Sequence, residues 1–426
     1  MFSFIHCSDL HLGTPFSGLK RIGSELTVGL HNATFDAFDR LCTTAIEAQV
    51  DFMVIAGDIY DGIKYGPKTA RFLRDRLEEL VQAGVAVYVC LGNHDDVGDL
   101  LAGIVPLPRG VHVFSGDAPE TFIHQTRSGE LVALHGRSFP TRMVRFDLAT
   151  GFPMASAGCY NIGVLHCTLA GSVGHETQAP VSTQKLASFG FDYWALGHIH
   201  TRSLTEVGEC LISYSGNLQG LSIKPSERGD KGALLVKVEG GRPTVEFLPI
   251  SRFKFDYLTV EAASNQSEAE TEDVEDRVFG ELLRIQEDLK AGTVLVLRID
   301  LVGRYRGRAL EADELNMVAD NLNLSLRRAG IETIYVESLK SSMLPELTIE
   351  ALSSLGGLLE AFDGAKGELS DPDLVQEYFN AMVPSGKNAA PPLLRTEYVD
   401  SIDPVQFIAE VCDEVLALLL EGGGES

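Results

Sequence analysis

Five short motifs rich in His, Asp and Asn carry the residue types in this chain that could do chemistry. Each motif follows a short run of apolar residues, and three of them contain a glycine that permits a sharp turn. The motifs are Asp9-Leu10-His11, Gly57-Asp58, Gly92-Asn93-His94, His166 and Gly197-His198-Ile199-His200. Imidazole, carboxylate and amide oxygen form a mixed nitrogen and oxygen ligand set that suits Mn, Fe or Zn.

A pair of such cations has a definite use in chemistry. Two ions held roughly 3.5–4 Å apart can generate hydroxide near neutral pH and neutralise charge on the attacking and leaving oxygens of a phosphate ester. One carboxylate must then bridge them. The five motifs therefore predict a two-metal site for phosphoester hydrolysis.

Each motif alone also has an ordinary structural interpretation. An Asp before a turn is commonly a cap or part of an Asx-turn, and a His after a strand is commonly a hydrogen-bonded polar residue. Five such motifs in succession favour a shared site. The chain has no Cys-x-x-Cys pair, which argues against a structural zinc knuckle.

The elements that must position these motifs are predicted by the apolar runs in front of them. The runs cover 2–6, 52–56, 85–91, 162–165 and 193–196, and they are typical of buried strands. Apolar residues at helical spacing predict helices over 35–49 and 67–83. Because open α/β sheets place their ligands at the carboxyl ends of strands, the motifs are expected to gather at one edge.

Taken together, the motifs resemble those of the calcineurin-like metallophosphoesterases, whose pattern runs D-x-H, G-D, G-N-H-D/E, H and G-H-x-H. The match here is complete, with Asp95 after His94, and it spans roughly the first half of the chain. The resemblance implies an α/β fold: a four-layer metallophosphoesterase β-sandwich flanked by helices, followed by a small α/β cap domain and a helical C-terminal tail.

The resemblance also implies a role for each residue of the motifs. His94 would not be a ligand, but would steady the transition-state phosphate or protonate the leaving oxygen. Two divalent ions are implied as cofactors, Mn²⁺ first, with Fe, Zn or Mg as alternatives. One ion would be held by Asp9, His11 and His200, and the other by Asn93, His166 and His198, with Asp58 bridging the two.

Further motifs are similar to the DNA repair exonuclease branch of this superfamily, the SbcD and YhaO type. They lie at 6–13, 56–61 and 215–220, while 134–139 is closer to the YhaO side. This branch hydrolyses phosphodiester bonds at DNA ends as an exonuclease or endonuclease. The candidates for positioning a substrate within these motifs are Asp61, Arg137 and Asn217.

Asp61 stands where some nuclease relatives carry a His that positions the DNA end. The direction of any exonuclease digestion therefore stays open. Asp-Gly at 61–62 would also make a good turn, so a purely structural role is the alternative.

Length and composition fit these expectations. A chain of 426 residues should hold two or three domains, and 45% hydrophobic residues suffice for a sizeable core. No apolar stretch approaches the roughly 20 residues needed to span a bilayer, and the N-terminus lacks a basic segment followed by an apolar one. Seven scattered cysteines indicate reduced thiols. We therefore expect a cytoplasmic protein without a membrane span.

Net charge argues against binding to nucleic acid, which usually depends on Lys and Arg contacts to phosphate. The chain carries −25. Residues 1–250 hold 20 Lys or Arg against 26 Asp or Glu, a net charge of −6, which leaves 15 against 34, a net −19, for 251–426. Bound metal ions would also neutralise the negative charges of Asp9 and Asp58. The acidity therefore lies mostly outside the catalytic half.

Three domains are predicted. The catalytic domain covers 1–252 and is closed by a hairpin of strands 232–239 and 244–250 around Gly240-Gly241. A DNA-binding-like α/β cap at 253–343 has the predicted order strand 257–261, helix 274–290, strand 294–301, helix 312–329 and strand 333–339. Candidates for contacts to the DNA backbone are Arg304, Arg306 and Arg308, with a solvated turn as the alternative.

The third region, 344–426, has a helical pattern and could bind a partner. Asp371-Pro372 and Asp403-Pro404 are typical helix starts, each followed by an apolar face. Such a face either packs on the protein itself or receives another protein. The resemblance implies a coiled-coil SMC-like ATPase subunit as partner, and a homodimer through the exposed side of helix 67–83 or through 99–104.

Two other functions are compatible with parts of the sequence. A phosphatase or phosphodiesterase for a small or nucleotide phosphoester would account for the acidity and predicts a narrow pocket. An acidic scaffold that binds proteins is the second alternative. A complete ligand set argues against the scaffold, because a scaffold needs neither a bridging Asp nor metal-ready His residues.

Overall fold

The computed structural model describes residues 1–14, 16, 24–61, 66–95, 106–171, 177–261, 271–305 and 310–345. The predicted C-terminal helices, Arg306, Arg308 and segment 99–104 lie outside the described residues. Two compact units divide the chain: the first comprises 1–257, 286–298 and 330–337, and the second 258–285, 299–329 and 338–426. The domain boundaries at residues 252 and 343 stay predictions.

Two six-stranded sheets form the centre of the first unit. In order across the first sheet, the strands are β12 (Arg242–Pro249), β11 (Gly232–Glu239), β1 (Phe2–Cys7), β2 (Phe52–Ala56), β3 (Ala86–Cys90) and β4 (Val111–Val113). Across the second they are β5 (Glu120–Gln125), β6 (Leu131–Arg137), β7 (Tyr160–His166), β8 (Tyr193–Gly197), β10 (Cys210–Tyr214) and β9 (Ser203–Val207).

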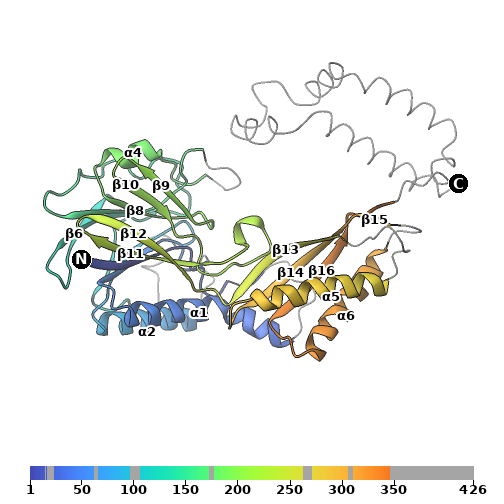
Figure 1. The fold of residues 1–426 in the computed structure, drawn as a ribbon. Helices are drawn as coiled ribbons and strands as arrows, with labels where there is room; N and C mark the ends of the chain where they lie inside the picture. The colour runs from blue at the N-terminus through green and yellow to red at the C-terminus, as the bar shows by residue number, and fades with distance from the viewer. Residues whose placement is uncertain are drawn as a thin grey trace, which may run out of the picture. The chain divides into compact units, whose positions relative to one another are not determined.

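Helices cover the outer faces of this sandwich (Figure 1). An apolar core that includes Phe4, Phe52 and Tyr193 lies between the sheets. A second core joins the first sheet to α1 (Ser24–Glu47) and α2 (Pro67–Gln82), and a third joins the second sheet to α4 (Thr183–Ser188). The four-layer β-sandwich flanked by helices is thereby confirmed.

Parallel pairing places the carboxyl ends of the central strands at one edge of each sheet. β1, β2, β3 and β4 run parallel, with Cys7 opposite Ile55 and Ala56 opposite Cys90. β6, β7, β8 and β10 also run parallel, with His166 opposite Gly197. The predicted hairpin at Gly240-Gly241 forms, and it adds β11 and β12 to the antiparallel side of β1.

After the sandwich, the order of elements matches the predicted cap. β13 (Phe253–Glu261), α5 (Thr271–Asp288), β14 (Val294–Val302), α6 (Ala312–Arg328) and β16 (Ile334–Ser341) follow one another, and the three strands form a sheet in the order β13-β14-β16. A two-stranded sheet pairs β15 (Arg304–Tyr305) with β17 (Leu344–Pro345).

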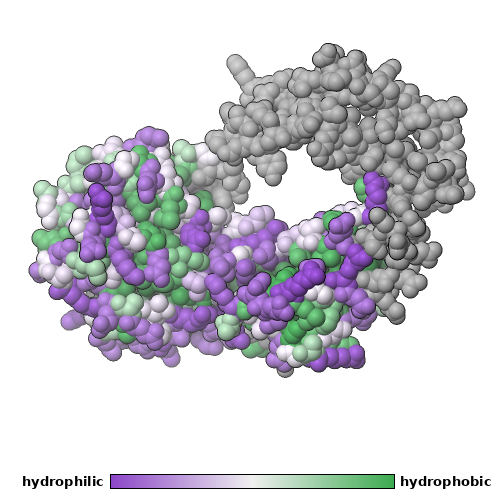
Figure 2. Space-filling view, in the orientation of Figure 1, coloured by the Kyte–Doolittle hydropathy of each residue, from purple (hydrophilic) through white to green (hydrophobic). Residues whose placement is uncertain are grey.

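The surface of α5 and α6 mixes polar and apolar side chains. Leu283, Met317 and Leu324 are 39%, 50% and 46% exposed. Figure 2 shows hydrophobic residues among hydrophilic ones over these helices. No helix in the described part of the chain combines the length and apolar character needed to cross a bilayer.

Candidate metal centre

The loops that follow β1 and β2 lie against each other and carry the first metal-ready side chains. The Asp9 amide donates to the Gly57 carbonyl at 2.9 Å, and the His11 amide donates to the Asp58 carbonyl at 3.0 Å. Four residues of the motifs have backbone conformations in the left-handed region. This conformation is strained for residues other than glycine, and such residues cluster at functional sites. These are Asp9 (φ 51°), His11 (φ 44°), Asp58 (φ 53°) and His198 (φ 97°).

Two glycines of the motifs make room for this close approach. A Cβ on Gly92 would lie 2.1 Å from Oδ1 of Asp58. A Cβ on Gly197 would lie 1.8 Å from the carbonyl oxygen of Ala56 and 2.8 Å from Nδ1 of His166. All three distances are too short for a Cβ atom. Positions 92 and 197 therefore require glycine, because neighbouring strand ends converge there.

Asp95, the last residue of the third motif, ties the loops after β2 and β3 together. Its buried carboxylate accepts hydrogen bonds from the amides of Gly92 at 2.8 Å and Ile59 at 2.5 Å. Longer bonds come from the amides of Asp58 and Tyr60. Asp95 therefore shapes the loops instead of facing the site.

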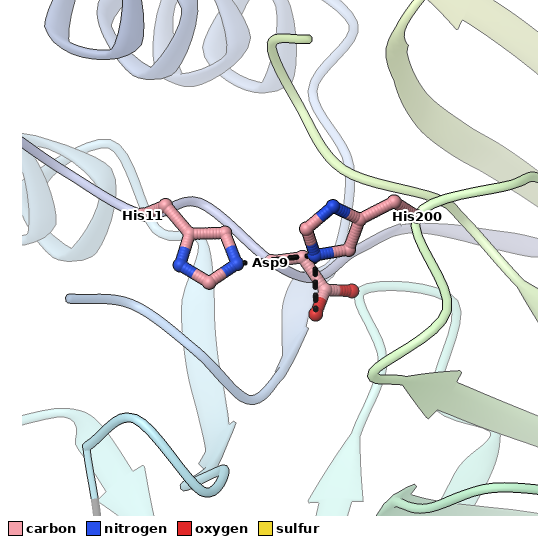
Figure 3. A group of neighbouring side chains, drawn as sticks. All are labelled: Asp9, His11 and His200. Atoms are coloured by element: carbon pink, nitrogen blue, oxygen red, sulfur yellow. Dashed lines mark hydrogen bonds and ion pairs between the residues drawn. The ribbon is translucent and has the colours of Figure 1, made fainter. Parts of the chain in front are cut away.

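Asp9, His11 and His200 form the first group of potential ligands (Figure 3). The Nε2 atoms of His11 and His200 lie 3.2 Å apart, and Nε2 of His200 lies 3.8 Å from Oδ1 of Asp9. Ligands at about 2.1 Å from one cation lie about 3.0–3.4 Å from each other in tetrahedral or octahedral geometry. The imidazole separation therefore suits a shared ion.

His11 adds a second indication of a ligand role. Burial lowers the pKa of its imidazole, which keeps the ring neutral and able to offer a lone pair. Its Nδ1 is buried and has no hydrogen-bond partner. On the other side of the ring, Nε2 faces Nε2 of His200, where a lone pair is available to an ion.

A second group contains Asp9, Asp58 and His166. Nε2 of His166 lies 3.4 Å from Oδ2 of Asp58 and 3.1 Å from Oδ1 of Asn93. The ring of His198 packs edge-on against that of His166, with centroids 5.2 Å apart. All residues predicted as ligands are thus brought together, six of them on loops after the strands and His166 at the end of β7.

Asp58 belongs to the second group and also faces a histidine of the first, while Asp9 is a member of both groups. Its Oδ2 is 3.9 Å from Nε2 of His11 and 3.4 Å from Nε2 of His166. Burial acts to raise the pKa of this carboxyl, but the charge and hydrogen bond of His166, followed by the charge of His11, hold it well below its usual range. An ionised carboxylate in this position can face two cations at once.

The far ring nitrogens of two histidines are also occupied. Nδ1 of His166 lies 2.9 Å from the carbonyl oxygen of Ala56, to which it can only donate. Nδ1 of His200 lies 2.5 Å from Oε1 of Glu227, a carboxylate that is 7% exposed. A proton on each Nδ1 leaves each Nε2 free to bind metal. The sequence patterns did not single out Glu227.

His94 and Asp61 form a pair at the accessible side of the site. Nδ1 of His94 lies 2.6 Å from Oδ1 of Asp61, and each side chain is 41% exposed. The hydrogen bond from His94 lowers the pKa of Asp61, and the same bond raises the pKa of His94. The ring of His94 also lies 5.2 Å, centroid to centroid, from that of His11. Asp61 is thus brought to the catalytic candidate.

The other residues predicted to position substrate differ in their surroundings. Asn217 has no exposed surface, and its Nδ2 donates to Oε2 of Glu227 at 2.7 Å. In this structure Asn217 is buried behind His200, so its predicted role in positioning substrate stays a prediction. Arg137 donates to the carbonyls of Gly116 and Asp117. Arg304 belongs to β15 in the second unit.

Carboxylates, imidazoles and an amide oxygen converge on one point, which defines the class: a metal-dependent hydrolase. The comparisons with known proteins identify the family. Residues 2–202 match the model of the calcineurin-like phosphoesterases. The chain is 33% identical over 315 residues to the uncharacterized metallophosphoesterase YhaO of Bacillus subtilis, covering 73% of this chain and 74% of that protein. The chain therefore belongs to the calcineurin-like phosphoesterases, which use a dinuclear divalent metal centre.

More distant relatives include proteins named for DNA repair or as nucleases. The DNA double-strand break repair protein Mre11 of Methanopyrus kandleri is 28% identical, with 58% of this chain and 56% of that protein covered. The SbcD component of the nuclease SbcCD from Bacillus subtilis is 24% identical, with 50% and 60% covered. This chain thus spans less than two thirds of the length of these two relatives.

Proposed function

We propose that this chain is a metal-dependent nuclease that hydrolyses phosphodiester bonds at DNA ends, in DNA repair. One observation carries the proposal: the Asp58 carboxylate faces His11 of one group of potential ligands and His166 of the other, at the ends of β1, β2, β7 and β8. This is the arrangement that a two-metal phosphoesterase requires. The names of the Mre11 and SbcCD relatives support DNA as the substrate.

The proposed ligand assignment follows the two groups. Asp9, His11 and His200 would hold one ion, Asn93, His166 and His198 would hold the other, and Asp58 would be shared by both. When bound, the two divalent ions, which we propose to be Mn²⁺, would supply Lewis acidity and would activate water for attack. Asp9, His11, Asp58 and His166 are buried, which restricts the movement of these side chains, while His94 stays accessible.

His94 supplies a proton in the proposed mechanism. Asp61 accepts the hydrogen bond from Nδ1 of His94, which orients the ring and stabilises its protonated form. Nε2 of His94 then carries the proton that the leaving oxygen receives. Asp61 is accordingly a residue that positions His94, and its effect on digestion polarity would come through that ring.

Partners and compartment complete the proposal. We propose that the chain works with a coiled-coil SMC-like ATPase, since one relative is part of the SbcCD nuclease, and that it forms a homodimer through the exposed side of α2. The thiols of Cys7, Cys90 and Cys167 are buried and form no disulfide bonds, as expected in a reducing cytoplasm.

A second candidate function is the hydrolysis of a small or nucleotide phosphoester. The charge favours it, because residues 1–250 carry a net −6 from 20 Lys or Arg against 26 Asp or Glu. A phosphodiester backbone would be repelled more strongly by this charge than a single small phosphoester.

Parallel assays with two substrates separate the two functions. Purified protein with Mn²⁺ is given linear double-stranded DNA labelled at one end and, in parallel, bis(p-nitrophenyl) phosphate. We expect shortened DNA products that EDTA abolishes. Turnover of the chromogenic diester with intact DNA would make the small phosphoester the better assignment. Absence of both activities would contradict the proposed function.

A further inference from the structure

Glu227 lies behind His200 and is fixed on both of its carboxylate oxygens. It ends the 3₁₀ turn η2 (Pro225–Glu227) and is 7% exposed. Its Oε1 lies 2.5 Å from Nδ1 of His200. Its Oε2 accepts hydrogen bonds from Nδ2 of Asn217 at 2.7 Å and from the amide of Leu221 at 2.9 Å. A carboxylate held in this way has little freedom to leave the imidazole.

The motif at 215–220 supplies this support. Asn217 is fully buried, and its backbone forms a parallel β-bridge with Ser8. The hydroxyl of Ser8 donates to Oδ2 of Asp9 at 2.5 Å. A chain of contacts therefore runs from Glu227 through Asn217 and Ser8 to Asp9, the carboxylate of the same ligand group.

Lys231 closes the network on the other side of His200. This lysine is 6% exposed, and its Nζ donates to the carbonyl oxygens of His200, at 2.7 Å, and of Ser226. Oε2 of Glu227 thus accepts from two groups that can only donate, and Oε1 is left facing Nδ1 of His200.

We propose that Glu227 is a positioning residue that holds the proton of His200 on Nδ1 and thereby aims the Nε2 lone pair at the ion shared with Asp9 and His11. The inference rests on the proposed metal site. It assigns the 215–220 motif to the support of one metal position and not to contact with substrate. A carboxylate behind a ligating imidazole fixes the tautomer and raises the basicity of the ligand.

This role predicts an effect on one metal position only. His166 directs its second hydrogen bond to the Ala56 carbonyl and does not depend on Glu227. Glu227→Gln keeps the size of the side chain but loses its charge, and its amide can present an N–H to Nδ1 of His200. We expect Mn²⁺ to bind the His200 position about 10–100-fold more weakly, the range seen when such outer partners are removed.

Mn²⁺ titration of the full chain, followed by the electron paramagnetic resonance signal of free Mn²⁺, measures both dissociation constants. The matched control is Glu246→Gln, because Glu246 is 56% exposed and paired only with Lys237 among the described contacts. One weakened constant in Glu227→Gln, with the other within twofold of wild type, supports the proposal. Two unchanged constants would overturn it, and so would equal weakening of both, which indicates only a structural role.

A measurement on the wild-type chain covers the case in which the variant does not fold. In protein with ¹⁵N-labelled histidine and diamagnetic Zn²⁺, His200 should show a proton on Nδ1 and metal on Nε2. The reverse arrangement would overturn the inference. If the wild-type protein binds no pair of cations, the proposed function itself is wrong. This result differs from the results that would overturn only the role of Glu227.

Discussion

At the scale of single residues, Asp58 decides what the site can do. Its Oδ2 faces both His11 and His166, and its Oδ1 accepts a hydrogen bond from the His94 amide at 3.0 Å. Negative charge, the proposed bridging of two metal ions and the position of His94 therefore depend on one side chain. Removing the charge of Asp58 should lower the rate of hydrolysis more than removing any ligand that contacts a single ion.

Asp58→Asn should abolish most activity. The amide keeps the shape of the side chain but loses the charge shared between two cations, which is worth several kcal/mol, or about 10³-fold in rate. Hydrolysis of bis(p-nitrophenyl) phosphate with Mn²⁺ and metal content by mass spectrometry check this expectation. Glu246→Gln, at an exposed residue on β12, should retain full activity. Near-normal turnover by Asp58→Asn would refute the bridging role.

His94→Gln should separate catalysis from metal binding. Because His94 is placed as a proton donor and not as a ligand, we expect kcat to fall by about 10²–10⁴-fold with both Mn²⁺ dissociation constants unchanged. Asp61→Asn should show a smaller loss in kcat, since it removes only the group that orients the ring. Loss of bound metal in His94→Gln would show that its role has been assigned wrongly.

The residues of the site were predictable to different degrees. Asp9, Asp58 and His166 follow apolar runs and belong to local motifs, so the sequence indicated that they converge. Glu227 reaches His200 only through the tertiary fold, 27 residues along the chain, and no local pattern marks it. Asn217 was found by its motif, but its burial beneath the site has no local signal.

At the scale of elements, the buried strands that precede the motifs were predicted well, whereas the edge strands β5 and β9 of the second sheet were not. β2 begins and ends at the predicted residues, and β3 and β8 lie within one residue of them. β5 alternates partly buried and exposed residues, and β9 is mostly exposed. Neither produces a continuous apolar run, because an edge strand of this sheet faces solvent on one side.

Gly197→Ala should destabilise the fold and damage the site together. The added Cβ would lie 1.8 Å from the Ala56 carbonyl oxygen, so β2 and β8 cannot keep their spacing. We expect a loss of about 3 kcal/mol or more in the free energy of unfolding, measured with urea. The control is Gly280→Ala in α5, where nothing lies within 4 Å and the helix should gain about 1 kcal/mol. Equal stability of both variants would contradict this packing.

His6 should make the metal-free protein less stable in mild acid. It is fully buried between the Tyr193 hydroxyl and the Leu196 carbonyl, and burial lowers its pKa from 6.5 to about 4. Below pH 6.5 the unfolded chain takes up a proton that the folded chain refuses, so stability falls as the pH drops from 6.5 to about 4 and then levels off for this group.

The expected loss from His6 is about 3 kcal/mol, from 1.36 kcal/mol for each pKa unit. Urea unfolding at a series of pH values measures it, and His6→Gln should reduce the slope in this range. The same slope in wild type and His6→Gln would mean that other groups, such as His124 or His135, dominate, since burial lowers their pKa values too.

At the scale of the whole molecule, charge governs how the chain could engage DNA. The net −25 is concentrated in 251–426, where 15 Lys or Arg face 34 Asp or Glu. We therefore expect few Lys or Arg contacts to DNA phosphates and weak affinity of the isolated chain for DNA. A basic partner protein would compensate for this.

Salt should consequently affect DNA digestion only moderately. With about two phosphate contacts, raising KCl from about 50 to about 200 mM should raise KM for DNA about tenfold, far less than the 10³–10⁵-fold of proteins with six to ten contacts. KM for bis(p-nitrophenyl) phosphate should change little. Steady-state kinetics at both salt concentrations check this, and a steep dependence would contradict the expectation of few phosphate contacts.

The central claim is that two cations share Asp58 between two histidine groups. An anomalous difference map from crystals of the full chain soaked in Mn²⁺ tests it most directly. The account predicts two peaks roughly 3.5–4 Å apart, with one contacting His11 and His200, the other His166 and His198, and both contacting Asp58. A single peak, or two peaks not bridged by Asp58, would contradict it.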